Sequence, residues 1–258
     1  MSVTATPDEL QAVLLARDFR ADDRVVQIGA NLPTARAGAL MAGLSTHPDL
    51  RVVIGLSVDN LATAASLPAV RELSFHARSA FEGEAVMDQG TVFDDVASPD
   101  VFFVGGLQVD RRGNVNLVGI PDGDGGWKVH GPGAVALATM STNCRGYYIL
   151  MPAHSPRVFV ERVASITALG DRTRRAELGL PGGGPRLLLS PLGVFDFNDH
   201  GDMRVVSLHP GVSLDDVQAA TGFALDVPEA VPTTAMPSPS ELDLLRERVD
   251  PGGLLRAT

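Results

Sequence analysis

Residues 24–56 read RVVQIGANLPTARAGALMAGLSTHPDLRVVIGL, and this stretch decides the fold class. Two short runs rich in valine and isoleucine, residues 24–29 and 51–56, each have the composition of a buried strand. Between them, the alanine- and leucine-rich segment that follows Pro33 has the composition of a helix. This order is typical of a parallel sheet covered by helices. We therefore predict an α/β fold with an open, mostly parallel sheet flanked by helices.

Helix signals lie on both sides of this stretch. Thr6 suits an N-cap and Pro7 the first helical position, so an N-terminal helix is predicted to begin there. Toward the C-terminus, Ser213 and Ser240 mark the starts of two more helices. An alanine-rich helix is also predicted after the glycine-rich residues 131–134.

Further strands follow the first two along the chain. They are predicted at residues 101–106, 147–151 and 158–163. RLLLSPLGVFDF and MRVVSLHPG are interpreted as adjacent strands joined by the turn NDHGD. Residues 171–185, which are basic at their start and glycine-rich at their end, are interpreted as an exposed loop. We expect one domain over residues 1–258.

Charge and composition exclude several classes of protein. The 21 Lys+Arg against 31 Asp+Glu give a net charge of −10, which argues against a nucleic-acid binder. Lys128 is the only lysine. Cys144 is the only cysteine, so neither an intrachain disulfide nor a cysteine metal cluster can form, and the histidine spacing predicts no metal site. With no signal peptide and no apolar run of about 18 residues, a cytoplasmic protein with no membrane partner is expected.

The best chemical candidate is the loop Gly131-Pro132-Gly133-Ala134 before a helix. A backbone with few side chains at a helix start can present N–H groups to an oxyanion or a phosphate. The alternative is a plain turn.

A second candidate is the segment that begins at Gly105-Gly106, where a strand ends in paired glycines. Such a strand end lets a ligand approach the backbone, and nearby polar residues could contact it. These residues are Gln108, Asp110, Asn114 and Asn116. In the alternative interpretation, Asp110 and Asn114 bond their own hairpin turn.

Other motifs give weaker signals. The chain has no Walker pattern, no G-x-G-x-x-G after a strand and no G-x-S-x-G elbow. His154 and Arg157 follow a predicted strand and could either bind an anion or cap the strand end. Residue chemistry alone indicates an α/β enzyme or a binding protein.

Three runs of sequence resemble, in the right order, the beta subunits of class I CoA-transferases of the glutaconate type. FFVGGLQVDRRGNVN is similar to their F-x-G-G-A-Q-V-D-x-x-G-N-x-N segment. HGPGAVALATM followed by ILMPAHSPRVFVERVASITALG is similar to their G-S-G-G-A loop and the strand region after it. LGVFDFNDHGDMRVVSLHPGVSLDDVQAATGFAL is similar to their C-terminal part. The resemblance extends from about Arg24 to the C-terminus.

The resemblance implies an open α/β fold, an alpha-type partner subunit in a heterodimer or heterotetramer, and an acyl-CoA substrate held at the subunit interface. Coenzyme A would be part of the substrate, with no other cofactor bound. The residues that would lie against the thioester or the CoA are Gly105, Gly106, Gln108, Gly131, Gly133 and Ala134.

The sequence departs from the transferases at their nucleophile. In the family, a glutamate after the second strand attacks the thioester. Here Gly55 occupies that position, and no glutamate occurs between the N-terminal helix and Glu72. Ser57 and Asp59 are the nearest polar candidates to replace it. Without the glutamate, no glutamyl-CoA intermediate can form.

We therefore expect a beta-type subunit of an acyl-CoA enzyme that hydrolyses a C–C bond, as in ring opening, or decarboxylates a CoA thioester. Two alternatives stay open. The chain could be a genuine CoA-transferase subunit, or it could be a non-catalytic ligand-binding or scaffold subunit.

Overall fold

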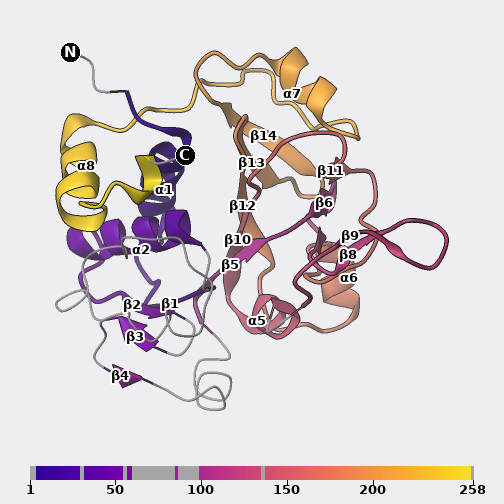
Figure 1. Ribbon diagram of the computed structural model, residues 1–258, viewed down its shortest axis with the longest axis horizontal. Helices are drawn as coiled ribbons and strands as arrows, with labels where there is room; N and C mark the ends of the chain where they lie inside the picture. Colours follow the sequence, from indigo (N-terminus) through magenta and orange to yellow (C-terminus); the bar gives the residue numbers. More distant parts are fainter. Residues whose placement is uncertain are drawn as a thin grey trace. The chain divides into compact units, whose positions relative to one another are not determined.

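The computed structural model describes residues 4–29, 32–54, 57–59, 85–86, 99–134 and 137–256 (Figure 1). The chain divides into two compact units. Unit 1 consists of residues 1–101 and 235–258, and unit 2 consists of residues 102–234. That the whole chain forms one domain stays a prediction.

Unit 1 begins with the predicted strand–helix–strand arrangement. Strands β1 (Val25–Ile28) and β2 (Arg51–Ile54) pair in parallel, with Val25 opposite Arg51. Two short strands, β3 (Ser57–Asp59) and β4 (Ala85–Val86), continue this sheet in the antiparallel direction. The side chains of Val26, Val52 and Val53 are buried, which explains the apolar composition of β1 and β2.

Two helices pack closely on each other beside this sheet. They are α1 (Pro7–Asp18) and α2 (Pro33–Ser45). Thr6 and Glu9 form a capping box at the start of α1, as the sequence signals predict for Thr6. Gly38 allows the close approach, because a Cβ there would lie 2.8 Å from Cβ of Leu15.

The C-terminal segment returns to unit 1. Helix α8 (Pro239–Asp243) is capped by Ser238, two residues before the predicted start at Ser240, and a π-helical turn (Leu244–Val249) and a 3₁₀ turn (Leu254–Arg256) follow. Arg246 donates to the buried carboxylate of Glu9 at 2.7 Å, which ties this segment to α1.

Unit 2 contains the remaining large strands, in the order β14-β13-β12-β10-β5. They are β5 (Val101–Gly105), β10 (Gly146–Leu150), β12 (Pro185–Leu189), β13 (Gly193–Phe197) and β14 (Met203–Leu208). β10 and β12 are parallel, whereas β12, β13 and β14 are antiparallel neighbours. The buried rings of Phe103 and Tyr148 stack between β5 and β10 with centroids 5.4 Å apart. With helices and mixed, partly parallel sheets in the chain, the predicted α/β class is confirmed.

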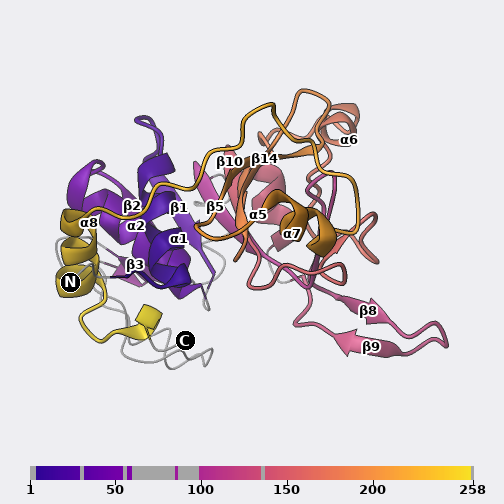
Figure 2. The same cartoon turned by 90° about the horizontal axis from the view of Figure 1, so that it is seen from above.

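Two smaller sheets complete unit 2. One contains β11 (Phe159–Val160), β6 (Gln108–Asp110) and β7 (Val115–Asn116). The other is the hairpin of β8 (Gly119–Pro121) and β9 (Trp127–His130), which projects from unit 2 in Figure 2. Three helices accompany these sheets, namely α5 (Leu137–Asn143), α6 (Arg172–Glu177) and α7 (Leu214–Ala220). Ser213 caps α7 as predicted.

Besides the start of α8, three local predictions were wrong in detail. The strand predicted at residues 158–163 is only two residues long, and RLLLSPLGVFDF forms two antiparallel strands, not one. The segment predicted as an exposed loop contains α6, because Asp171 caps its start and Arg175 is buried. The Arg175 guanidinium donates to carbonyl oxygens of three residues. A short helix with no apolar stripe carries no periodic signal.

Within the described ranges, none of the helices combines the length and apolar character needed to cross a membrane.

Candidate functional site

The two glycine-rich segments predicted from the sequence meet in unit 2. β5 ends at Gly105, the chain turns at Gly106, and Leu107 then packs against Gly131. A Cβ at Gly131 would lie 2.9 Å from Cδ1 of Leu107. The structure therefore brings residues 105–108 and 131–134 together, although they are separated by two hairpins.

Gly131 is fixed by contacts that only glycine allows. It is buried, its N–H donates to the Val118 carbonyl at 2.8 Å, and a Cβ there would collide with the Leu117 carbonyl oxygen. Gly133 has φ +90° and donates its N–H to the Leu117 carbonyl at 3.3 Å. The glycines thus let the loop lie directly on the backbone of residues 117 and 118.

These bonds limit what the loop offers to a ligand. The N–H groups of Gly131 and Gly133 are donated within the protein, so an oxyanion would have to use Ala134 or later residues. Ala134 is exposed, and α5 begins at Leu137, after residues 135–136, which the structure does not describe. A Cβ at Gly133 would meet nothing within 4 Å, so the outer side of the loop is open. Ligand binding by this loop stays a prediction.

A buried amide pair supports the loop from below. Asn116, which is fully buried, donates from Nδ2 to Gln108 Oε1 at 3.0 Å and to the Gly119 carbonyl at 2.8 Å. Its Oδ1 accepts the N–H groups of Val118 and Gly119. Gln108 Oε1 also accepts the Ala164 N–H at 3.1 Å. The Gln108 side-chain oxygen therefore holds the backbone on which Gly131 lies, and its predicted contact with a thioester stays a prediction.

Asp110 and Asn114 bond their own turn, so the hairpin interpretation is confirmed for them. Asp110 Oδ1 accepts the N–H groups of Arg112 and Asn114, and Asn114 Nδ2 donates to Asp110 Oδ2 at 3.1 Å. Burial raises the pKa of Asp110, against the lowering effect of these hydrogen bonds. Asn114 Oδ1 accepts the N–H groups of Gly170 and Asp171, which joins the turn to the start of α6.

The residues at the family's nucleophile position belong to unit 1. β2 ends at Ile54, and Gly55 lies outside the described residues. Ser57 and Asp59 are in β3, where Ser57 pairs with Ile54 and Asp59 with Val52. Ser57 is therefore opposite the last residue of β2, whereas Asp59 is opposite a residue two positions earlier.

His154 belongs to a hydrogen-bonded group that sequence reasoning missed. Its ring stacks on Phe159 with centroids 3.5 Å apart, and its nitrogens contact Ser190 Oγ at 2.8 Å and Thr221 Oγ1 at 3.0 Å. Thr221 donates its own hydrogen to the Val217 carbonyl, so it accepts from His154 Nε2–H, and Ser190 donates to Nδ1. Burial lowers the pKa of His154 to about 4. His154 is therefore a neutral structural residue, and no strand pattern reveals its hydroxyl partners.

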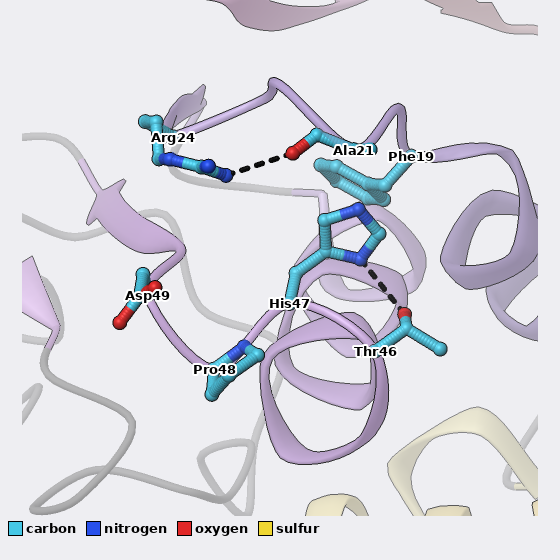
Figure 3. A pocket seen from close by; sticks show the side chains of 7 residues that line it. All are labelled: Phe19, Ala21, Arg24, Thr46, His47, Pro48 and Asp49. Carbon is cyan, nitrogen blue, oxygen red and sulfur yellow. Dashed lines mark hydrogen bonds between the residues drawn. The ribbon is translucent and has the colours of Figure 1, made fainter.

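The described part of unit 1 has a pocket of 440 Å³, drawn in Figure 3. His47 Nε2 hydrogen-bonds the Arg20 carbonyl, and Arg24 donates to the Ala21 carbonyl. The pocket is lined by Phe19, Ala21, Arg24, Thr46, His47, Pro48 and Asp49. These residues precede β1 and β2, so the pocket lies at the amino ends of these parallel strands. Ligands of open α/β sheets bind at the carboxyl ends, and we do not assign this pocket to the active site.

Metal and thiol chemistry have little support among the described residues. No group of three or more His, Cys, Asp or Glu side chains there is arranged to hold a metal ion. Cys144 is buried, and burial raises the pKa of its thiol to about 12. A thiol of this kind is a poor nucleophile at neutral pH.

Comparison with known proteins places this geometry in a family context. No family model matches the chain. The sequence is 31% identical over 263 residues to the beta-type chain of glutaconate CoA-transferase of Acidaminococcus fermentans, covering 96% of this chain and 93% of that protein. It is 32% identical to the cholesterol ring-cleaving hydrolase IpdB subunit of Mycobacterium tuberculosis, covering 97% of each chain. The fold matches a crystal structure of the decarboxylase AibA/AibB with a TM-score of 0.78 and 27% identity, covering 98% of both chains.

Proposed function

Because the chain belongs to the class I CoA-transferase family as a beta-type subunit, we propose that it forms an acyl-CoA enzyme with an alpha-type subunit and cleaves a C–C bond of the acyl group. The reaction is hydrolysis, as in ring opening, or decarboxylation. Coenzyme A is part of the substrate, and no separate cofactor is needed.

The observation that carries this proposal is the residue after β2. Transferases of the family use a glutamate there as nucleophile, and this chain has Gly55. The register of β2 and β3 supports the same conclusion. Asp59 is the nearest carboxylate in sequence, but it pairs with Val52 and so is set back from the end of β2. Ser57, which pairs with Ile54 at that end, is the better candidate for a polar contact with the substrate.

The chemistry that remains does not need a covalent enzyme intermediate. Breaking a C–C bond near a thioester leaves carbanion-like charge, which the thioester carbonyl delocalises and which nearby N–H donors stabilise. We assign this contact to the exposed side of residues 132–134, where the space over Gly133 is open. Gln108 and Asn116 keep that loop in place, and Gly106 lets the end of β5 pack closely on Val115 and Asn116. General acid and base groups would come from the alpha-type subunit.

The named relatives support this range of reactions. One is a ring-cleaving hydrolase subunit and one a decarboxylase with two named components. The glutaconate CoA-transferase chain is about equally similar, so CoA transfer is the first alternative. A non-catalytic scaffold subunit is the second.

The test uses the complex of this chain with the alpha-type subunit of the same genome. The complex is incubated with a panel of acyl-CoA thioesters and the products are identified by mass spectrometry. A product that has gained water with a C–C bond broken, or that has lost CO2, supports the proposal. CoA exchange between acids, together with a hydroxylamine-sensitive enzyme ester, would establish the transferase alternative instead.

A variant pair separates the catalytic from the scaffold interpretation. Gly131→Ala moves the loop and Gln108→Ala removes its support, so each should lower turnover in a subunit that contacts the thioester. Leu178→Ala, at an exposed residue after α6, is the control. Unchanged turnover in folded Gly131→Ala and Gln108→Ala complexes would favour the scaffold.

A further inference from the structure

The hairpin of residues 119–130, which we call the arm, differs from the rest of unit 2 in its exposure. It projects from the unit in Figure 2, and all four residues of β9 are exposed. The Trp127 side chain is 48% exposed and Val129 is 39% exposed. Trp127 is the only tryptophan of a chain with 5% aromatic residues. A large ring on a projecting hairpin is uncommon on a surface that faces only water.

A bulge aligns the arm's rings on one face. Gly119 pairs with His130, Ile120 with Val129, and Pro121 with Trp127, so Lys128 is the extra residue. Gly119 and Pro121 share a face because they are two residues apart. Their partners Trp127 and His130 therefore share it too, although they are three apart. Their rings meet edge to face with centroids 5.6 Å apart.

Contacts within the arm itself hold it in one conformation at two points. At Gly119 the missing side chain makes room for the Trp127 ring, because a Cβ there would lie 2.6 Å from Cε3 of Trp127. At the tip, Asp122 Oδ1 accepts the N–H groups of Asp124 and Gly126, both at 2.9 Å. A preorganised ring loses little conformational freedom on binding, which favours a role as an anchor.

We propose that the arm docks on the alpha-type subunit and that Trp127 is its central anchor. Tryptophan is the residue type most often found to dominate interface energy. A second copy of this chain is a poorer occupant, because its net charge of −10 would repel an identical chain. The arm also runs directly into Gly131 at the end of β9, so a partner that covers it is held next to the proposed thioester loop. The identity of the partner rests on the proposed function.

Binding to the co-expressed alpha-type subunit tests the proposal. Trp127→Ala should raise the dissociation constant of the complex at least about tenfold. Trp127→Glu, which adds a charge to the anchor position, should raise it further. Leu178→Ala is the matched control, because Leu178 is 50% exposed on the same unit, and it should change the constant less than about twofold. Circular dichroism of each free variant confirms that the chain is folded.

A direct probe needs no substitution. Labelling with 5-fluorotryptophan gives a single ¹⁹F resonance from this chain, which should shift and broaden when unlabelled alpha-type subunit is added. The arm proposal is overturned if Trp127→Glu binds the alpha-type subunit as tightly as wild type and the resonance of the labelled wild-type chain does not shift on binding. If the free chain is instead a dimer that Trp127→Glu converts to a monomer while alpha binding is unchanged, a second copy is the occupant and the proposal is wrong.

The failure of the arm proposal can be told apart from that of the proposed function. A tight complex that depends on Trp127 but cleaves no C–C bond supports the arm and contradicts the reaction. A complex that cleaves C–C bonds and binds equally well with Trp127→Glu supports the reaction and contradicts the arm proposal. If no complex forms with the wild-type chain, the arm proposal fails.

Discussion

Two consecutive hairpins of unit 2 have the same local architecture and opposite surroundings. In the hairpin of residues 108–116, the side chains of Gln108, Asp110, Asn114 and Asn116 are buried and bonded to one another or to nearby backbone. In the arm, which follows two residues later, apolar side chains are exposed on β9. Buried polar groups that satisfy each other fix a conformation, whereas exposed rings on a rigid hairpin are available to a partner. The first hairpin therefore positions the glycine loop, and the second is suited to recognition.

The largest expected effect on stability is in the buried hairpin of residues 108–116. Asn116→Ala leaves the N–H groups of Val118 and Gly119 without their side-chain acceptor and removes one of the two donors to the Gln108 oxygen, which keeps the Ala164 N–H. We expect it to lower the free energy of unfolding by about 3 kcal/mol, measured by urea denaturation. The control is Asn143→Ala, at a half-buried residue whose amide makes one solvent-exposed hydrogen bond to the Thr139 carbonyl, with an expected loss of about 0.5 kcal/mol or less. Equal effects would show that the buried network is not what holds the hairpin.

Substitutions of Gly131 and Gly133, in the loop that follows the arm, test how tightly each glycine is packed. Gly131→Ala forces a Cβ against two carbonyl oxygens and should lower stability by about 2 kcal/mol and turnover at least about tenfold. Gly133→Ala places its Cβ in open space and has only the φ +90° strain to overcome, about 1 kcal/mol. Thermal unfolding and steady-state assays of the complexes that contain each variant compare the two losses of stability and of turnover. A larger effect at Gly133 would contradict the assigned packing.

The buried His154 predicts a smaller, pH-dependent effect. Its pKa in the folded chain is lowered to about 4, against about 6.5 when unfolded. Below about pH 6.5 the unfolded chain therefore binds a proton that the folded chain does not. The stability that comes from keeping His154 neutral and buried is therefore fully present above about pH 6.5 and is lost as the pH falls from 6.5 toward 4. The drop in melting temperature from pH 7 to pH 5 should be smaller in His154→Gln than in wild type, and an equal drop would contradict the assignment.

The smallest expected effect is on the arm of the free chain. Trp127→Ala should change the free energy of unfolding by no more than about 0.5 kcal/mol, because the ring is half-exposed and lies against Gly119 and His130 of the arm. The same substitution should weaken the complex strongly. Urea denaturation of the free chain, compared with the binding measurements, checks this separation. A loss of stability like that of Asn116→Ala would mean that the arm is a folding element.

Much of the fold could be predicted from the sequence because its signals are local. Thr6 and Ser213 cap helices where predicted, Pro7 is the first residue of α1, and the apolar runs of β1, β2, β5 and β10 form strands. The errors come from long-range contacts. Arg175 anchors helix α6, because its guanidinium donates to the carbonyl groups of Thr142, Leu169 and Gly182. No local pattern predicts such contacts.

The site was predictable in a different way. Glycines 105, 106, 131 and 133 were singled out as a strand end and a loop before the resemblance gave them a role. The structure explains Gly106 and Gly131 by close packing and Gly133 by its positive φ. The roles of the polar residues differ from a simple reading of the motif. Gln108 and Asn116 look like ligand contacts in the sequence but bond each other in the fold. Sequence shows that such residues lie near a loop, not which groups satisfy them.

The bulge at Lys128 has a chemical consequence. Because this is the only lysine of the chain, the arm carries its only side-chain primary amine. Apart from the chain's α-amino group, amine-reactive cross-linkers can therefore attach to this chain only at the arm, beside its only tryptophan. A lysine-specific protease likewise has a single site to cut, between Lys128 and Val129. Protection of that one bond would register the covering of the arm in any mixture, without purification of the complex.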